Sequence, residues 1–260
     1  MTLTKGPRVL FWDIETAQNL VALFQLAHND FVDPSWIVRE RYMISAAWSW
    51  NDDPKVYSVS VLDDPKRYAK DPYDDYYVVK TLYNVLEEAD VIVGHNADNF
   101  DKKWLDTRAL VHGLAPLPPI PSIDTYKVAK KRLLLNSNKL DYIAKLLKVG
   151  SKIPTTPGLW MRVLAGEKKA IREMVSYNRH DVTVTRNVFK KLQPFVDNHV
   201  NRELFGETGC PRCGSKKFQS RGTHKAITRV YQRYQCQNPK CMGWFKKVRA
   251  EKGSTTYSVL

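Results

Sequence analysis

The amino-acid sequence predicts an α/β fold, a mixed sheet flanked by helices, followed by a second and much smaller domain. Strand-like apolar runs dominate roughly the first sixty residues, and strands alternate with helices after them. All four cysteines lie between residues 210 and 241, which sets that segment apart. A hydrophobic fraction of 43% among 260 residues is sufficient for one core of ordinary size.

Apolar runs bounded by turn residues predict the strands. We expect them at 8–13, 42–50, 56–62 and 91–94, with a turn at 51–54. Apolar residues three and four apart predict helices at 75–89, 101–112, 124–133, 139–147 and 167–196, the last bent or broken near Pro194. The proline-containing segments 116–121 and 151–160 are expected to be connections.

The positive charge is concentrated near the C-terminus. Residues 210–252 contain twelve Lys or Arg and a single acid, Glu251, while the whole chain has a net charge of +14. Such a segment indicates a polyanionic partner, most commonly nucleic acid, although a solvated tail that aids solubility has the same composition. No apolar run is long enough for a membrane span, and residues 1–7 do not resemble a signal peptide. We therefore expect no membrane contact and a cytosolic location, in a bacterium or a phage-infected host cell.

Two acidic residues follow the first apolar strand. Residues two apart project from the same face of a strand, so Asp13 and Glu15 point together. Two adjacent carboxylates repel each other unless a cation lies between them, which makes this pair a candidate divalent-metal site. By itself, however, the pair is also what a solvent-exposed strand end contains.

Two later segments add acids at defined positions. Asp101 follows the strand 91–94 and a glycine turn, where it either binds a metal or caps the helix that begins there. Tyr177 and Asp181 are four residues apart in the last long helix, so a phenol and a carboxylate share one helical face. Taken separately, these two could equally be a packed tyrosine and a surface acid.

Together the three segments resemble the motifs of the DEDD superfamily of 3′–5′ exonucleases, in its tyrosine-containing (DEDDy) branch. The resemblance covers about residues 6–197, and the matching positions are Asp13 and Glu15, then Asn96, Phe100 and Asp101, then Tyr177 and Asp181. The segments 123–126 and 138–144 resemble the region between the second and third motifs in the proofreading domains of family B DNA polymerases. Asp124 in that region is expected to cap a helix rather than to bind metal.

The resemblance implies an RNase H-like (DnaQ-like) exonuclease domain over residues 1–200. It also implies that Asp13 bridges two Mg²⁺ or Mn²⁺ ions, that Glu15 and Asp181 hold the ion that activates water, and that Asp101 holds the other. Tyr177 is too weak an acid to serve as a strong base at neutral pH, so we expect its phenol to orient the attacking water. A histidine serves in the alternative branch, but His180 lies about 100° around the helix from Asp181.

Aromatic and polar residues near the second motif are candidates for contact with nucleic acid. An exonuclease of this kind must separate terminal nucleotides, and aromatic side chains can stack on their bases. The candidates are Asn96, Phe100, Trp104 and Trp160. For each of the aromatic residues, packing in the core is an equally good interpretation.

The four cysteines form two close pairs, Cys210 with Cys213 and Cys236 with Cys241, which is the spacing of zinc ligands. Strand-like residues at 228–235 and 243–247 accompany them. We therefore predict a zinc ribbon over residues 210–253 with one structural Zn²⁺, joined by a linker at 201–209. His224 could replace a cysteine, but four cysteines are sufficient.

The ribbon interleaves basic and aromatic residues, a pattern that suits single strands or the backbone of duplex DNA. The basic residues are Arg221, Lys225, Arg229, Arg233, Lys246, Lys247 and Arg249, and the aromatic ones are Tyr231, Tyr234 and Trp244. A module that docks on a polymerase or another replication protein is the alternative.

Three functions are compatible with these motifs. The first is a DNA exonuclease that acts in replication or repair and prefers single-stranded 3′ ends, which the resemblance to family B polymerases favours. The second is an RNA-trimming exonuclease, since motifs do not reveal a pocket for a 2′-hydroxyl. The third is a non-catalytic nucleic-acid-binding protein, against which the full set of five catalytic positions argues.

Overall fold

The structure is a computed structural model that describes residues 6–23, 32–156, 158–200, 202, 208–225 and 230–248. The chain divides into two compact units, Arg8–Phe189 and a second unit that contains Lys190 and the residues after it. Of the predicted linker, only residues 202, 208 and 209 lie among the described residues, and Arg229 and 249–253 lie outside them. The predicted limits of the exonuclease domain, linker and ribbon therefore stay a proposal.

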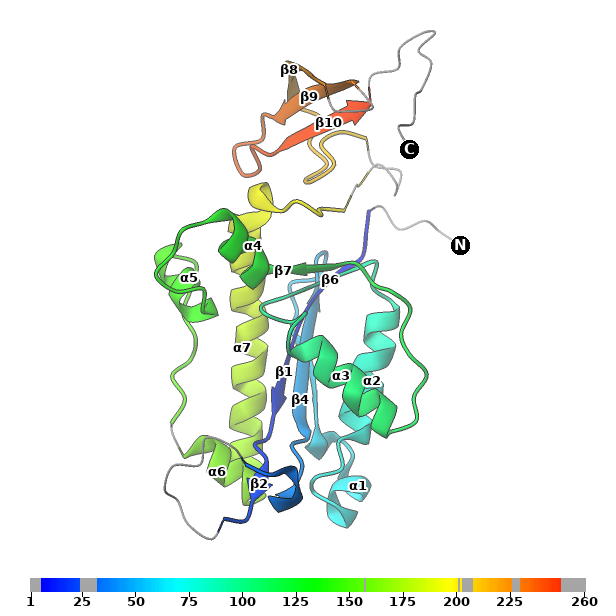
Figure 1. Ribbon diagram of the computed structural model, residues 1–260, viewed down its shortest axis with the longest axis vertical. Coiled ribbons are helices and arrows are strands. Elements are labelled where there is room, and N and C mark those ends of the chain that lie inside the picture. Colours follow the sequence, from blue (N-terminus) through cyan, green and yellow to red (C-terminus); the bar gives the residue numbers. More distant parts are fainter. Residues whose placement is uncertain are drawn as a thin grey trace. The chain divides into compact units, whose positions relative to one another are not determined.

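A five-stranded mixed sheet is the centre of the first unit (Figure 1). The strand order is β5-β4-β1-β6-β7, in which β1 is antiparallel to β4 and parallel to β6. Every residue of β6 is buried, as its unbroken apolar sequence predicts. The strands are β1 (Val9–Thr16), β4 (Met43–Trp50), β5 (Tyr57–Ser60), β6 (Val91–Gly94) and β7 (Ser122–Asp124), and a separate pair is formed by β2 (Leu20–Val21) and β3 (Ile37–Arg39).

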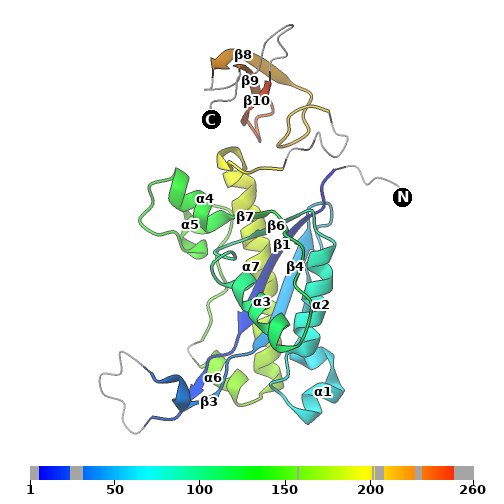
Figure 2. The same cartoon turned by 45° about the vertical axis from the view of Figure 1, so that its right-hand side comes forward.

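Helices cover both faces of this sheet. Figures 1 and 2 place α2 and α3 on one face and α7 on the other. Trp12 and Ile14 of β1 belong to the same core cluster as Leu82 of α2, whereas the ring of Phe11 lies 5.4 Å from that of Phe189 in α7. The helices are α1 (Pro65–Lys70), α2 (Tyr76–Glu87), α3 (Asp101–Val111), α4 (Thr125–Arg132), α5 (Leu140–Leu146), α6 (Leu159–Leu164) and α7 (Lys168–Leu192).

The alternation of β1 therefore fixes which face carries the acids. Asp13 and Glu15 are an even number of residues from Phe11, so they share the face that α7 covers. The antiparallel register continues from Leu10 to Glu15 and shifts only between Glu15 and Thr16. Both carboxylates thus stand on regular strand backbone beneath the helix that carries Asp181.

Most predicted elements are confirmed, with differences at their ends. The first strand was expected to end at Asp13 and continues to Thr16, and the expected connection 151–160 is wrong at its end, because α6 begins at Leu159. The long helix ends at Leu192, and a 3₁₀ turn, Gln193–Phe195, follows at the proline, as predicted. Among the described residues, six helices and strands were not predicted: β2, β3, β7, β8, α1 and α6. Five of these are too short for periodicity to define them.

The second unit contains a three-stranded antiparallel sheet in the order β10-β9-β8. Its strands are β8 (Phe218–Lys225), β9 (Val230–Cys236) and β10 (Trp244–Val248). The first cysteine pair lies in a turn before β8, which Gly214 completes with a φ of 74°. Among the described residues, no helix combines the length and the apolar sequence that crossing a bilayer demands.

Candidate active site

Three of the predicted acids come together on the α7 face of the sheet. Carboxylate oxygens of Asp13, Glu15 and Asp181 all lie within 4.8 Å of one another. Two are two residues apart in β1 and one comes from α7, so strand alternation and helix position create the cluster. Carboxylate oxygens are the hard ligands that Mg²⁺ or Mn²⁺ prefers.

Asp101 lies beside this cluster rather than within it. As the first residue of α3, it accepts a hydrogen bond of 3.2 Å from the backbone N–H of Ile14, between the two acids of β1. After desolvation, the charge of Asp101 is the largest of the causes that raise the pKa of Asp13. Phe100, not Asp101, occupies the N-cap position of α3, so the expectation that Asp101 is the capping residue does not hold.

The turn before α3 depends on small residues. A Cβ atom at Gly94 would lie 2.4 Å from the Cβ of Ala97, and Asn96 adopts a left-handed backbone with a φ of 63°. Asp124 holds this turn, since its carboxylate accepts hydrogen bonds from the backbone N–H groups of Asn96 at 2.8 Å and Tyr126 at 2.9 Å. It is the N-cap of α4, and the prediction that Asp124 is structural is confirmed.

The acids are held in surroundings that oppose their ionisation. Desolvation, followed by the repulsion of Asp181, raises the pKa of Glu15 to about 8. Desolvation also raises the pKa of Asp101 to about 7, and the pKa values of Asp13 and Asp181 are raised for the same leading reason. A divalent cation would remove this cost, because it would replace the mutual repulsion by attraction.

One carboxylate oxygen has no internal partner. The side chain of Asp181 is only 2% exposed, and its Oδ1 accepts no hydrogen bond from the described residues. A buried charged oxygen without a donor is costly unless it coordinates a cation. This oxygen and the spacing of the three carboxylates fit a divalent metal.

Lys152 is a member of the site that the sequence did not reveal. It pairs with Asp181 through Oδ2, and its Nζ donates a hydrogen bond of 3.0 Å to the phenol oxygen of Tyr177. Tyr177 and Asp181 therefore project together, as the spacing of four predicted. His180 faces the loop instead, where its Nε2 donates to the carbonyl of Ser151 at 2.7 Å.

Asn178 is the second missed residue. Its Nδ2 donates to Oδ2 of Asp13 at 2.7 Å, and its Oδ1 accepts from the hydroxyl of Ser45 at 3.1 Å. Asn178 is fully buried. The available sequence signal was its spacing of three residues from Asp181 in the same helix, which places the two on neighbouring positions of the helix surface. No comparable local signal exists for Lys152, which comes from a loop.

A cavity of about 390 Å³ adjoins the acids, since Lys152, which pairs with Asp181, is one of its lining residues. Its other lining residues are His95, Asn96, Tyr126, Asn138, Lys139, Leu140 and Asp141. Of the aromatic candidates, Phe100 is exposed, whereas Trp104 and Trp160 are half-buried and pack against the core. The core interpretation is therefore the better one for the two tryptophans.

The four cysteines form one cluster, with all Sγ atoms within 4.8 Å of one another. The Sγ atoms of Cys210 and Cys241 are 4.0 Å apart, and those of Cys213 and Cys236 are 3.6 Å apart. A tetrahedral zinc ion with bonds of about 2.3 Å places its sulfurs about 3.8 Å apart. The backbone N–H of Asn238 also donates to the sulfur of Cys236 at 3.4 Å. The cluster fits the predicted zinc ribbon.

Comparison with known proteins agrees with this fold. Residues 49–193 match the RNase H superfamily, so the chain belongs to that nuclease superfamily. The structure is similar to that of the family B DNA polymerase from the hyperthermophilic archaeon Pyrobaculum calidifontis, with a TM-score of 0.55 and 20% sequence identity. The match covers 79% of this chain but only 26% of the polymerase, and at this identity it shows the fold alone. No curated protein matches the sequence.

Proposed function

We propose that this protein is a metal-dependent 3′–5′ exonuclease that removes nucleotides from single-stranded DNA ends in replication or repair. The observation that carries the proposal is the cluster of Asp13, Glu15 and Asp181, with Asp101 beside it. Hydrolysis of a phosphodiester needs an activated water and a stabilised leaving oxygen. Two Mg²⁺ or Mn²⁺ ions, when bound by these four carboxylates, supply both.

The chain's own residues position the reacting groups. Asn178 fixes the orientation of Asp13, which is repelled by the other three acids and would be one of the ligands that hold the metal ions. Desolvation raises the pKa of Tyr177, so its phenol stays protonated at neutral pH and can hold a water by a hydrogen bond. Lys152 keeps its positive charge beside Asp181, where it limits the repulsion among the acids.

The substrate strand has an adjoining place to bind. The cavity next to Lys152 is lined by aromatic, amide and cationic side chains, including Tyr126, Asn138 and Lys139. Such groups suit a base and its phosphate. Phe100, which is 37% exposed at the start of α3, is the remaining aromatic candidate for contact with a base.

The two alternatives are an exonuclease that acts on RNA and a non-catalytic protein that binds nucleic acid. An exoribonuclease of this superfamily would need a donor or acceptor for the 2′-hydroxyl in that cavity. A non-catalytic binding protein would not need several ionisable acids at the cost of desolvation. The zinc ribbon is proposed to bind nucleic acid or a replication protein such as a polymerase.

Digestion of labelled substrates tests the proposal. With Mg²⁺ or Mn²⁺, a 5′-labelled single strand should give a ladder that shortens one nucleotide at a time, and a 3′-labelled strand should release only mononucleotide. Duplex DNA and RNA of the same sequence, run in parallel, measure the preference. Fragments longer than one nucleotide from the 3′-labelled strand would indicate an endonuclease, and faster loss of RNA would favour the exoribonuclease.

A further inference from the structure

The sheet of the ribbon has two chemically different faces. In the β9–β10 register, Phe245 is opposite Tyr234, while Lys246 is opposite Arg233 and Trp244 is opposite Gln235. Directly opposed residues share a face, and neighbours along a strand alternate. One face therefore carries Phe245 and Tyr234, and the other carries Trp244, Lys246 and Arg233.

The first face is the core of the ribbon. The rings of Tyr234 and Phe245 stack at 5.3 Å, and the ring of Phe218 lies 5.4 Å from each of them. Phe245 also packs against the four-cysteine cluster. Tyr234, which the sequence placed among the candidates for nucleic-acid contact, is thereby assigned to the core.

The outer face combines aromatic rings with cations. Trp244 is 49% exposed, the Nζ of Lys246 lies 4.2 Å from the ring centre of Tyr231, and Tyr231 in turn stacks on His224. Arg221 reaches the same face, since its Nε donates to Oε1 of Gln235 at 3.2 Å. The sequences of the three strands contain no Asp or Glu.

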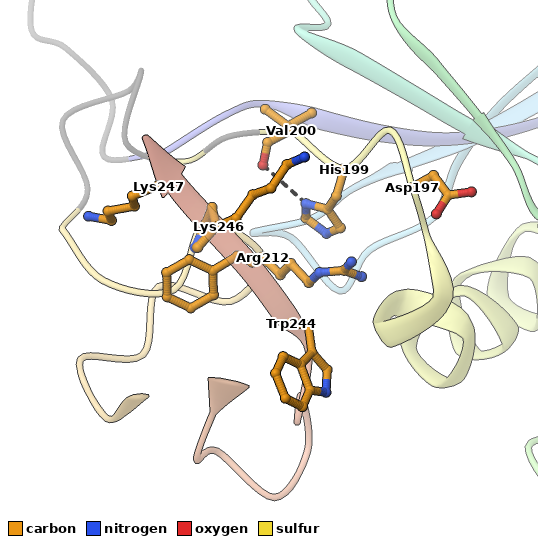
Figure 3. A pocket seen from close by; sticks show the side chains of 9 residues that line it. Asp197, His199, Val200, Arg212, Trp244, Lys246 and Lys247 are labelled. Atoms are coloured by element: carbon orange, nitrogen blue, oxygen red, sulfur yellow. Dashed lines mark hydrogen bonds between the residues drawn. The ribbon is translucent and has the colours of Figure 1, made fainter. Parts of the chain in front are cut away.

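A pocket of about 260 Å³ lies along β10, the edge strand of this sheet (Figure 3). Trp244 and Lys246 line it together with His199, Arg212 and one acid, Asp197. Burial lowers the pKa of His199, so its imidazole is neutral at pH 7; Nδ1 donates to the carbonyl of Val200, and Nε2 accepts from Gln193 at 3.1 Å. Two hydrogen bonds between Gln193 and Arg212, each from a side chain to the other residue's backbone carbonyl, hold this side of the pocket in place.

We propose that the outer face and this pocket bind single-stranded nucleic acid, with one base stacked on Trp244 and the phosphates contacted by Lys246, Arg233 and Arg221. An aromatic ring can stack only on a base whose face is free, which favours an unpaired strand over a duplex. Cations alone would suit any polyanion, and the rings supply the preference for bases. The inference rests on the proposed function only in taking the substrate strand as the ligand.

The test measures binding of the full, zinc-loaded chain to a labelled oligothymidylate by fluorescence anisotropy, in an Asp13→Ala background that prevents digestion. Trp244→Ala should weaken binding about tenfold or more, the usual effect of losing a base–aromatic stack, and Trp244→Phe should retain most of it. On an abasic strand of equal length, Trp244→Ala should have no effect. Zinc content measured for each variant shows that the ribbon is folded.

Charge is tested separately. Lys246→Ala should weaken binding to both strands and lower the log–log salt slope of that binding by about 0.7. Lys240→Ala is the matched control, because Lys240 is an exposed lysine in the turn between β9 and β10. Unchanged binding by Trp244→Ala, or an equal loss on the abasic strand, would overturn the inference. So would tighter binding of polyglutamate than of the oligonucleotide, which would indicate a protein partner.

The proposed hydrolytic activity has a separate readout, so the two failures are distinguishable. A chain that binds the strand through Trp244 but releases no nucleotide refutes the exonuclease and leaves this inference standing. A chain that digests DNA but binds the strand equally well after Trp244→Ala refutes this inference and leaves the exonuclease standing.

Discussion

Replacing Asp13 by Asn tests whether the acids form a metal site at all. Asn is nearly the same size and keeps an oxygen for the hydrogen bond from Asn178, so the fold should be retained. The change removes one of three charges that lie within 4.8 Å. At an effective dielectric of about 20, each pair at that distance repels by about 3 kcal/mol. The charge of Lys152 and proton uptake by the acids offset part of this repulsion. We therefore expect Asp13→Asn to raise the free energy of unfolding of the metal-free chain by on the order of 1–3 kcal/mol.

The stabilisation of the metal-free chain by Asp13→Asn should increase with pH. The pKa of Glu15 is about 8 in the folded protein, whereas an unperturbed glutamate has a pKa of 4.5, so the folded state holds more protons than the unfolded chain between these values. The stability that this proton contributes is complete below about pH 4.5 and is lost as the pH rises through about 8. The free energy of unfolding of the metal-free wild type should therefore fall over this range of pH, and that of Asp13→Asn should fall less.

Urea unfolding of the full chain, with zinc retained and no Mg²⁺, at about pH 6 and about pH 8, measures both effects. Added Mg²⁺ should stabilise the wild type more than the variant. Hydrolysis by Asp13→Asn should be abolished. A variant that is less stable than the wild type at both pH values, or that retains near-normal turnover, would refute the reasoning.

Three further changes probe the rest of the site and the ribbon. Tyr177→Phe should slow hydrolysis by about 10²–10⁴-fold without changing metal binding, and an unchanged rate would assign the tyrosine to packing alone. Lys152→Ala should destabilise the metal-free chain by about 1–3 kcal/mol, because Asp181 loses its partner, and Mg²⁺ should restore most of the loss in thermal unfolding. Deletion of residues 207–260 should leave hydrolysis of short oligonucleotides intact but weaken binding to long DNA and lower its salt slope by about 0.7–0.9 per lost phosphate contact. Zinc chelation should mimic that deletion, and an unchanged slope would favour protein docking.

Sequence periodicity predicted the parts of the site that depend on one element at a time. Alternation along β1 placed Asp13 and Glu15 on one face, and helical spacing placed Tyr177 with Asp181. Lys152 could not be predicted in this way, because its position depends on a loop that His180 and other distant residues hold. The contact between Asn178 and Asp13 spans 165 positions and likewise exists only after folding.

The ribbon shows the same limit. The cysteine spacing predicted the metal cluster, and the alternating sequence of β9 predicted a strand. The sequence of β8 has little apolar alternation, and its strand is defined by pairing with β9, which shifts register between Ser220 and Thr223. Which basic residues share a face with Trp244 depends on that pairing, so the division into a core face and an outer face required the structure.

The dependence of hydrolysis on added Mg²⁺ tests the central claim most directly, with zinc retained and with wild type and Asp181→Ala compared on one single-stranded DNA. The wild type should release no nucleotide without added metal and should reach a saturating rate as Mg²⁺ is titrated, while Asp181→Ala should stay inactive throughout. Release that is unaffected by the omission of Mg²⁺, or a variant as active as the wild type, would contradict a metal-dependent centre at these carboxylates.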